Sequence, residues 1–232
     1  MKRFWLLALF AGCLAQAGQF EEGLEAEKNL KLYEARDHFR AALKESPDAP
    51  GMAEHTGWFL FLNGFHDEEC VALLRKGGSS GQDPAAMERA ARQVERELGL
   101  RGPADQAEKD EQKAFQKMKM EQAATGSDAD RGSALVDAGE YAEGVVLLER
   151  AVKESPDNLA LELKLARSYL WSGKKSEADQ AYARLLKKQP GNPALLYERA
   201  GVAASEDQLD RARILLTAAE KARPGDTRIL LE

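Results

Sequence analysis

The side chains best suited to metal binding or nucleophilic chemistry are few in this sequence. Its 232 residues include three histidines and two cysteines. His66 and Cys70 are four residues apart, which on one helix would place both on the same face as possible metal ligands. Two ligands with no further histidine or cysteine nearby do not make a structural zinc site. We therefore expect no metal here and interpret Asp67, Glu68 and Glu69 as an acidic first helical turn, which complements the helix dipole.

A second candidate, Ser172–Ser176, has a faint similarity to a phosphate-binding loop. It lacks the upstream glycine of the G-x4-G-K-[ST] pattern and follows no predicted strand. The sequence also contains no G-x-S-x-G or H-E-x-x-H pattern, and no cysteine–histidine pair with an orienting group. We therefore predict no catalytic residues and no cofactor, which disfavours an enzyme.

Residues 1–17 have the pattern of a cleaved secretory signal. Lys2 and Arg3 precede an almost wholly apolar run from Phe4 to Leu14, and Ala15-Gln16-Ala17 fits a small-x-small cleavage site. The apolar run is shorter than the roughly 20 residues that a membrane-spanning helix needs. We expect cleavage after Ala17 and export of the chain to a bacterial periplasm, or its secretion.

Cys13 allows a second interpretation of the same segment. Ala11-Gly12-Cys13 resembles the end of a bacterial lipobox, in which the cysteine is lipidated and becomes the first mature residue. Phe10 stands where that motif prefers leucine or another aliphatic residue. Lipidation of Cys13 is therefore the alternative to a soluble chain. Cleavage after Ala17 would leave Cys70 as the only cysteine, which predicts a buried thiol and no internal disulfide.

The charge balance argues against a nucleic-acid partner. Lysine and arginine number 33 against 39 aspartates and glutamates, giving a net charge of -6 at pH 7, and no basic cluster is present. Such a chain repels phosphate backbones. Hydrophobic residues make up 44% of the sequence. That content is enough for the core of one domain or of two small ones.

Beyond residue 17 the apolar periodicity is helical throughout. Apolar residues recur at helical spacing, as in Leu161, Leu165 and Tyr169, and no sustained alternation predicts a strand. Clusters of proline, glycine, asparagine and aspartate separate the helical stretches, as at Ser155–Asn158 and Gln189–Asn192. This pattern predicts short antiparallel helix hairpins.

A repeat of 34 residues organises these hairpins, because Pro156, Pro190 and Pro224 are separated by that interval. Small residues recur at position 8 of each repeat (Gly23, Gly57, Gly132, Ala166, Ala200) and at position 20 (Ala35, Gly144, Ala178, Ala212). The pattern resembles the tetratricopeptide repeat (TPR) family, whose unit is helix A, a turn and helix B. Small residues at these positions let the two helices approach closely, and proline at position 32 ends helix B.

The resemblance implies an all-α fold, a right-handed superhelical stack of about five to six antiparallel helix pairs. It covers residues 16–49, 50–83, 125–158, 159–192 and 193–226. The second of these repeats is degenerate, because Glu69 occupies position 20 and no proline closes it. Between residues 84 and 124 we expect two helices, 84–98 and 104–123, forming a diverged third pair or else a hinge. The expected organisation is a signal peptide (1–17), two repeats (18–83), the diverged segment (84–124), three repeats (125–226) and a tail (227–232).

The resemblance also implies where a partner would bind. In the family, helix A positions 2, 5, 9, 12 and 13 line a concave groove for peptides or helices. We expect Trp171 to be the main anchor, since tryptophan, tyrosine and arginine dominate interface energetics. Arg167, one turn earlier, would contact a partner carboxylate or stack on a partner ring. The remaining predicted groove residues are Trp58, Phe61, Leu62, Leu163, Leu170 and Tyr197. Alternatively, Trp58 and Phe61 pack as core under residues 77–104, and Trp171 is itself core.

These observations favour a non-catalytic protein–protein interaction scaffold or adaptor in the bacterial cell envelope. The resemblance implies a protein or peptide partner from cell-envelope machinery, since exported proteins of the family that it resembles often serve outer-membrane, pilus, secretion or polysaccharide assembly. One alternative is a lipid-anchored outer-membrane assembly factor, acylated at Cys13. An enzyme with its site in residues 77–124 is the least favoured class.

Overall fold

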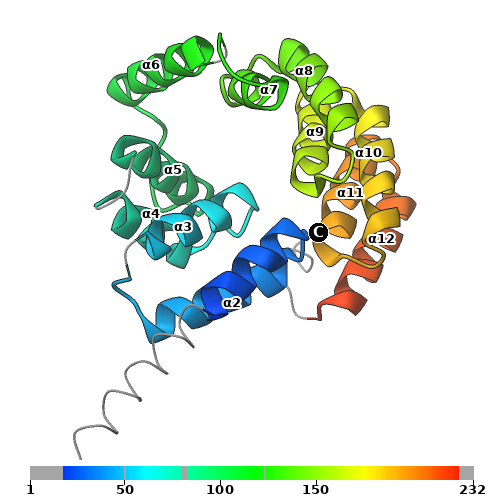
Figure 1. Cartoon of the computed structure of the whole chain (residues 1–232), viewed down its shortest axis with the longest axis horizontal. Coiled ribbons are helices and arrows are strands. Elements are labelled where there is room, and N and C mark those ends of the chain that lie inside the picture. Colours follow the sequence, from blue (N-terminus) through cyan, green and yellow to red (C-terminus); the bar gives the residue numbers. More distant parts are fainter. Residues whose placement is uncertain (1–17, 50, 80–82, 123, 225–232) are drawn as a thin grey trace, which may run out of the picture. The chain divides into compact units, whose positions relative to one another are not determined.

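The computed structural model describes residues 18–49, 51–79, 83–122 and 124–224, and within these ranges every regular element is a helix (Figure 1). The fold is the all-α array of consecutive helix pairs that the sequence predicts. The elements are a helix over residues 18–28 and then α2 (Leu32–Glu45), α3 (Met52–Leu62), α4 (Glu68–Gly78), α5 (Pro84–Glu97), α6 (Gln106–Gln122), α7 (Asp128–Asp137), α8 (Tyr141–Glu154), α9 (Leu159–Trp171), α10 (Lys175–Lys188), α11 (Pro193–Ser205) and α12 (Leu209–Ala222).

The predicted signal peptide with Cys13, and the tail over 227–232, lie outside the described residues. Among the helices that are described, none combines the length and the apolar character needed to cross a membrane.

The helices form two compact units, with the boundary between Ala104 and Asp105. In the N-terminal unit, α5 packs against α4. In the C-terminal unit, α6 packs against α7. The boundary therefore falls inside the diverged segment over 84–124, and the two helices predicted there belong to different units.

In the N-terminal unit, glycine at position 8 brings helix A against helix B. A Cβ atom on Gly23 would lie 2.5 Å from the ring of the buried Phe39 in α2. A Cβ atom on Gly57 of α3 would lie 2.9 Å from the backbone nitrogen of Leu74 in α4. Any larger side chain would wedge these helices apart, so the close approach confirms the physical reason for the predicted small residues.

The second repeat departs from the predicted register by one residue after its turn. Asp67 caps α4, its carboxylate accepting a hydrogen bond from the Cys70 backbone N–H at 2.8 Å. Cys70 is fully buried, with Sγ 4.0 Å from the Gly57 carbonyl oxygen, whereas the exposed Glu69 accepts a hydrogen bond from Arg40. Cys70 thus takes the buried place of the small residue at position 20, to which the 34-residue count assigns Glu69. The predicted burial of the thiol is confirmed, and that burial raises its pKa to about 12.

The C-terminal unit follows the predicted register throughout. Gly132 in α7 and Gly144 in α8 face each other so closely that a Cβ on either would lie 3.1 Å from the other's carbonyl oxygen. In the next pair, Ala166 of α9 and Ala178 of α10 are fully buried at the equivalent positions. The same small residues that mark the repeat in the sequence therefore form the contact between helices A and B.

Caps and turns fix where each helix of this unit begins. Asn158 and Asn192 cap α9 and α11, their side-chain oxygens accepting from the backbone N–H groups of the first turn. The turns from helix A to helix B place Gly139 and Gly173 at φ +88° and +77°, in the left-handed region that glycine enters without strain. Asp207 occupies the equivalent turn before α12 at φ +58°. The helix A–helix B geometry is thus repeated three times in this unit.

Candidate partner-binding surface

The residues that the sequence marks for metal or phosphate chemistry have structural partners. His66 lies before α4 and does not share a helix face with Cys70. Its ring contacts the carboxylate of Glu97 and, through Nε2, the carbonyl oxygen of Phe61 at 2.9 Å. No group of three or more histidine, cysteine or acidic side chains suited to a metal ion occurs in the described part of the chain. The Ser172–Ser176 segment forms the turn into α10, and Lys175 donates a hydrogen bond to the carbonyl oxygen of Ser205.

In the N-terminal unit, the predicted groove residues form an aromatic cluster at the end of α3. Trp58 and Phe61 are half-buried and meet edge to face, with ring centroids 5.8 Å apart. Phe61 also stacks on His66 at 5.5 Å, and His66 contacts Glu97 at the end of α5. Leu62 beside them is 61% exposed. The cluster is linked to α5 through His66 and keeps part of its surface open.

In the C-terminal unit, Trp171 is the last residue of α9 and is 54% exposed. Its ring rests on Tyr141, the first residue of α8, with centroids 6.0 Å apart. Leu170 and Tyr197 are half-buried. The Tyr141 ring covers part of Trp171, and about half of the Trp171 surface is open. It is not part of the buried core.

Arg167 already has a partner within the protein. Its Nε and Nη2 atoms donate to the two carboxylate oxygens of Glu198 in α11, at 2.9 and 2.6 Å. The hydroxyl of Tyr182 in α10 donates to the same carboxylate at 2.8 Å. Burial lowers the pKa of the Arg167 guanidinium, but the charge and hydrogen bonds of Glu198 raise it by more, so the group stays charged.

Two of the predicted contacts therefore need correction. The Arg167 side chain is 20% exposed, and its charge is matched by Glu198, so it is not available to a partner carboxylate unless that ion pair breaks. Leu163 is 4% exposed and belongs to the buried core, so it is not open to a partner.

The exposed surface that the helix A segments α9 and α11 share has one member that sequence reasoning missed. Gly201 stands at position 9 of its repeat, three residues after Glu198, and is exposed in the middle of α11. Position 9 is one of the family's groove positions, so the repeat register could have identified Gly201, but a residue without a side chain was not considered as a contact. We name this surface the helix-A face and define it by the side chains that lie open or half-open on it: Leu170, Trp171, Tyr197, Gly201 and Ala204.

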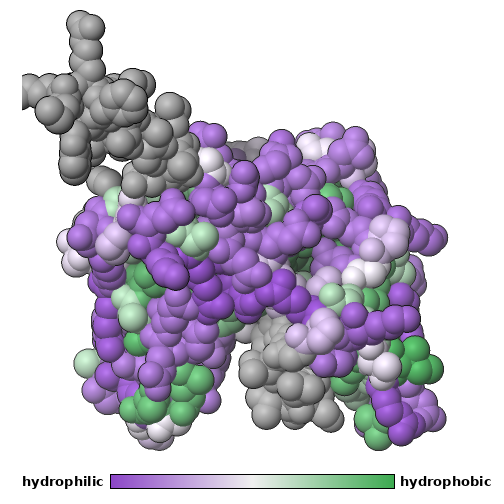
Figure 2. All heavy atoms as spheres, turned by 90° about the horizontal axis from the view of Figure 1, so that it is seen from below, coloured by the Kyte–Doolittle hydropathy of each residue, from purple (hydrophilic) through white to green (hydrophobic). Residues whose placement is uncertain are grey.

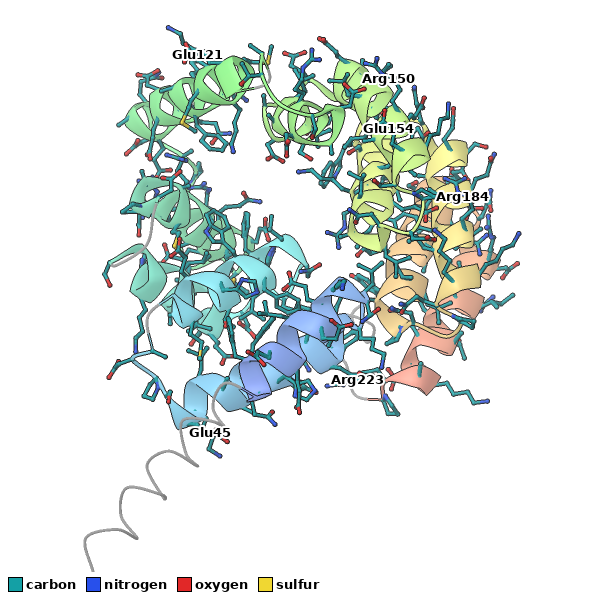
Figure 3. The ribbon with its side chains drawn as sticks, in the orientation of Figure 1. Glu45, Glu121, Arg150, Glu154, Arg184 and Arg223 are labelled. Atoms are coloured by element: carbon teal, nitrogen blue, oxygen red, sulfur yellow. The ribbon has the colours of Figure 1, made fainter. Side chains whose placement is uncertain are left out.

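Both basic residues of α9 are paired with carboxylates. Besides the Arg167–Glu198 pair, Lys164 of α9 contacts Asp137 of α7 at 3.1 Å. By contrast, the helix B segments α8 and α10 carry a charged surface, on which Figure 3 labels Arg150, Glu154 and Arg184. The side of the molecule seen in Figure 2 is likewise mostly hydrophilic, with hydrophobic residues in small separate patches. The helix-A face therefore has open aromatic and small residues, and the basic residues of α9 next to it are paired.

Solved structures of helical repeat proteins resemble this chain at low sequence identity. The crystal structure of YrrB, described as a TPR protein with an unusual peptide-binding site, is 14% identical, with 92% of this chain and 89% of that chain covered and a TM-score of 0.37. A tetratricopeptide repeat protein from Parabacteroides merdae is 14% identical, with coverages of 94% and 97% and a TM-score of 0.39. The TPR2AB domain of yeast Sti1, in a complex with pHSP90, is 14% identical, with coverages of 90% and 90% and a TM-score of 0.38.

The sequence matches no curated protein. Two family models, both described as tetratricopeptide repeat, match residues 20–84 and residues 135–194. Together these matches cover more than half of the chain, and they fall on the helix pairs whose small residues make the close contacts described above. The chain belongs to the tetratricopeptide repeat family.

Proposed function

We propose that this protein is a non-catalytic interaction scaffold of the bacterial cell envelope, which holds a partner peptide or domain on its helix A surfaces. The observation that carries the proposal is Trp171, half exposed at the end of α9 and supported by Tyr141. A large aromatic side chain that stays in water contributes little to folding. It is, however, a residue type that dominates binding energy when a partner covers it.

The envelope location is supported by residues 1–17, where a basic start, an apolar run and a small-x-small site follow one another in the order of a secretory signal. Lipidation of Cys13 is the second form of the same proposal, since it would tether the scaffold to a membrane.

A non-catalytic role is supported by the state of the residues that could act as nucleophiles or bases. Cys70 is the one cysteine after residue 17, and its buried thiol has a raised pKa, which disfavours the reactive thiolate. All three histidines contact carboxylates of the N-terminal unit: His38 contacts Glu22, His55 contacts Glu27 and His66 contacts Glu97. These side chains contribute to packing between helices.

The location is tested by expressing the full chain in a Gram-negative bacterium, fractionating the cells and measuring the intact mass of the recovered protein. A periplasmic chain that begins at Gly18 is expected. A membrane fraction whose chain begins at a diacylated Cys13 would favour the lipid-anchored form. A cytoplasmic chain that begins at Met1 would overturn the envelope assignment.

The scaffold role is tested in the same cells with a photo-crosslinking amino acid at position 171. Position 214 is the matched control, because Ile214 is also an exposed apolar residue but lies on helix B of its repeat. We expect a discrete crosslinked protein from position 171 and none from position 214. Equal crosslinking from both positions, or none from position 171, would contradict the proposal.

A further inference from the structure

The last described helix, α12, is packed differently from the other B helices of the C-terminal unit. The α8 helix packs against both α7 and α9, and α10 packs against both α9 and α11. By contrast, α12 packs against α11 and is joined to α10 through the Arg211–Asp179 ion pair. Within this unit, no described helix lies beyond α12. The side of α12 that corresponds to the α11-facing side of α10 is therefore open in the described part of the chain.

The repeat register identifies the residues on this side of α12. In α10, the side that meets the following helix carries Lys175, Asp179 and Tyr182. Each of these side chains forms a hydrogen bond with a group of α11. The residues 34 positions later, in α12, are Leu209, Arg213 and Leu216. We name these three residues the α12 end stripe.

The two leucines of the end stripe are open to solvent. Leu209 is 67% exposed, and Leu216 is half-buried. In the two preceding repeats the position of Leu216 is taken by Leu148 and Tyr182, which are 0% and 1% exposed. Helix A of the next pair packs against helix B in both of those repeats. The end stripe therefore has the apolar character of a contact between helix pairs.

The sequence that follows α12 repeats the sequence that begins α11. Pro190-Gly191-Asn192 precedes α11, and Pro224-Gly225-Asp226 occupies the same positions 34 residues later. Asn192 caps α11, and aspartate is an equally good capping residue. Leu195, which is fully buried in α11, corresponds to Ile229. Residues 225–232 lie outside the described residues, and their match to the start of α11 predicts another helix A.

We propose that residues 226–232 begin a further helix A, capped by Asp226, which packs its apolar side on the α12 end stripe. The segment is long enough for about two helical turns, and its apolar side chains are Ile229, Leu230 and Leu231. Covering the two leucines of the stripe removes apolar surface from water, which favours the packed state. The stripe is separate from the helix-A face, so this inference goes beyond the proposed scaffold function.

The first test measures thermal stability in the chain that begins at Gly18, with a matched pair of exposed residues. Leu209→Gln changes the end stripe. Ile214→Gln is the control, because Ile214 is 69% exposed and lies two residues before Leu216, on nearly the opposite side of α12. We expect Leu209→Gln to lower the melting temperature by about 2–4 °C, since a covered leucine contributes to folding, and Ile214→Gln to change it by less than about 1 °C.

A second pair of variants tests whether residues 226–232 are the cover. Ile229→Gln should lower the melting temperature by about 2–4 °C, as Leu209→Gln does. The double variant Leu209→Gln/Ile229→Gln should lose less than the sum of the two single losses, because either substitution already disrupts the same contact. The direct measurement is nuclear magnetic resonance of methyl-labelled protein. We expect nuclear Overhauser cross-peaks between the Ile229 methyl groups and those of Leu209 or Leu216.

The inference is overturned if Leu209→Gln and Ile229→Gln both melt with the wild type, or if these cross-peaks are absent. Sedimentation distinguishes another occupant, because a dimer that Leu209→Gln dissociates would assign the stripe to a second copy of the chain. That result would also overturn the inference. The proposed function is judged separately by crosslinking from position 171, which lies on the helix-A face. A crosslinked partner with an uncovered end stripe keeps the scaffold and removes only the further helix.

Discussion

Arg167 and Glu198 join helix A of one repeat to helix A of the next through two hydrogen bonds of 2.9 and 2.6 Å. The Tyr182 hydroxyl on the intervening helix B donates to the same carboxylate, so three consecutive helices meet at one ion pair. This arrangement stabilises the surface on which Trp171 is displayed. The pair therefore belongs to the framework of the helix-A face, while the aromatic and small residues around it are the part that is open to a partner.

Removing Glu198 should destabilise the C-terminal unit more than removing the whole pair. Glu198→Ala removes the carboxylate to which the largely buried Arg167 and Tyr182 both donate, and we expect a loss of about 2–4 kcal/mol in unfolding free energy. The double variant Arg167→Leu/Glu198→Leu should recover most of that loss. Urea unfolding of the three proteins checks this prediction. A single variant within about 0.5 kcal/mol of the wild type would contradict it.

Asp207→Gly should stabilise the protein. Asp207 holds φ +58° in the turn before α12, where the two preceding repeats have Gly139 and Gly173. A residue with a Cβ atom is strained in this left-handed region, so we expect a gain of about 0.5–1 kcal/mol from glycine. Thermal unfolding measures it, with Gly173→Asp as the reciprocal variant. A lower melting temperature for Asp207→Gly would contradict the expected backbone strain at Asp207.

Asp179 should make stability depend on acid pH. Its carboxylate accepts hydrogen bonds from Arg199 and Arg211. Burial raises the pKa of Asp179, but the two arginines lower it by more, so the folded value lies below the ordinary 3.8. Its contribution is therefore complete above pH 3.8 and is lost as pH falls through the folded pKa.

The variant Asp179→Asn tests this dependence. We expect it to cost about 1–3 kcal/mol of unfolding free energy at pH 7, with the difference shrinking below pH 3.8. Asp210→Asn is the control, because Asp210 pairs with Arg213 on the exposed surface and should contribute less than about 1 kcal/mol. A difference between Asp179→Asn and wild type that stays constant from pH 7 to pH 3 would rule out the linkage.

Cys70 should be unreactive in the folded protein. Its thiol is fully buried beside Gly57, and burial raises its pKa to about 12, so very little thiolate exists at neutral pH. We expect the mature chain to react with a disulfide-exchange reagent at pH 8 only after denaturant is added. Rapid modification of the native protein would show instead that α4 opens readily from α3.

The sequence predicted the fold because the repeat depends on residues whose role is local and physical. Gly132, Gly144, Ala166 and Ala178 mark close helix contacts, and only small side chains fit there. The one-residue shift at Cys70 escaped the prediction, because a strict count of 34 residues assigns Glu69 to position 20, whereas the loop before α4 is longer than that count allows and α4 begins after Asp67.

The candidate site was less predictable, because a residue's position on helix A does not show which side chains from other helices contact it. Arg167 has a groove position, but its charge is matched by Glu198, which is 31 residues away in the sequence. Leu163 has a groove position and is buried. Gly201 was not predicted, because the sequence does not show whether the space around a helical glycine is open or packed.

The paired measurement of stability and partner affinity in Trp171→Ala tests the central claim most directly, with the protein crosslinked from position 171 as partner and Ile214→Ala as control. Since Trp171 is 54% exposed, we predict a nearly unchanged melting curve. We also predict an affinity loss of about thirtyfold, or at least about 2 kcal/mol. A stability loss of roughly 3–5 kcal/mol would assign Trp171 to the core. A folded variant with unchanged affinity would remove it from the interface and contradict the account.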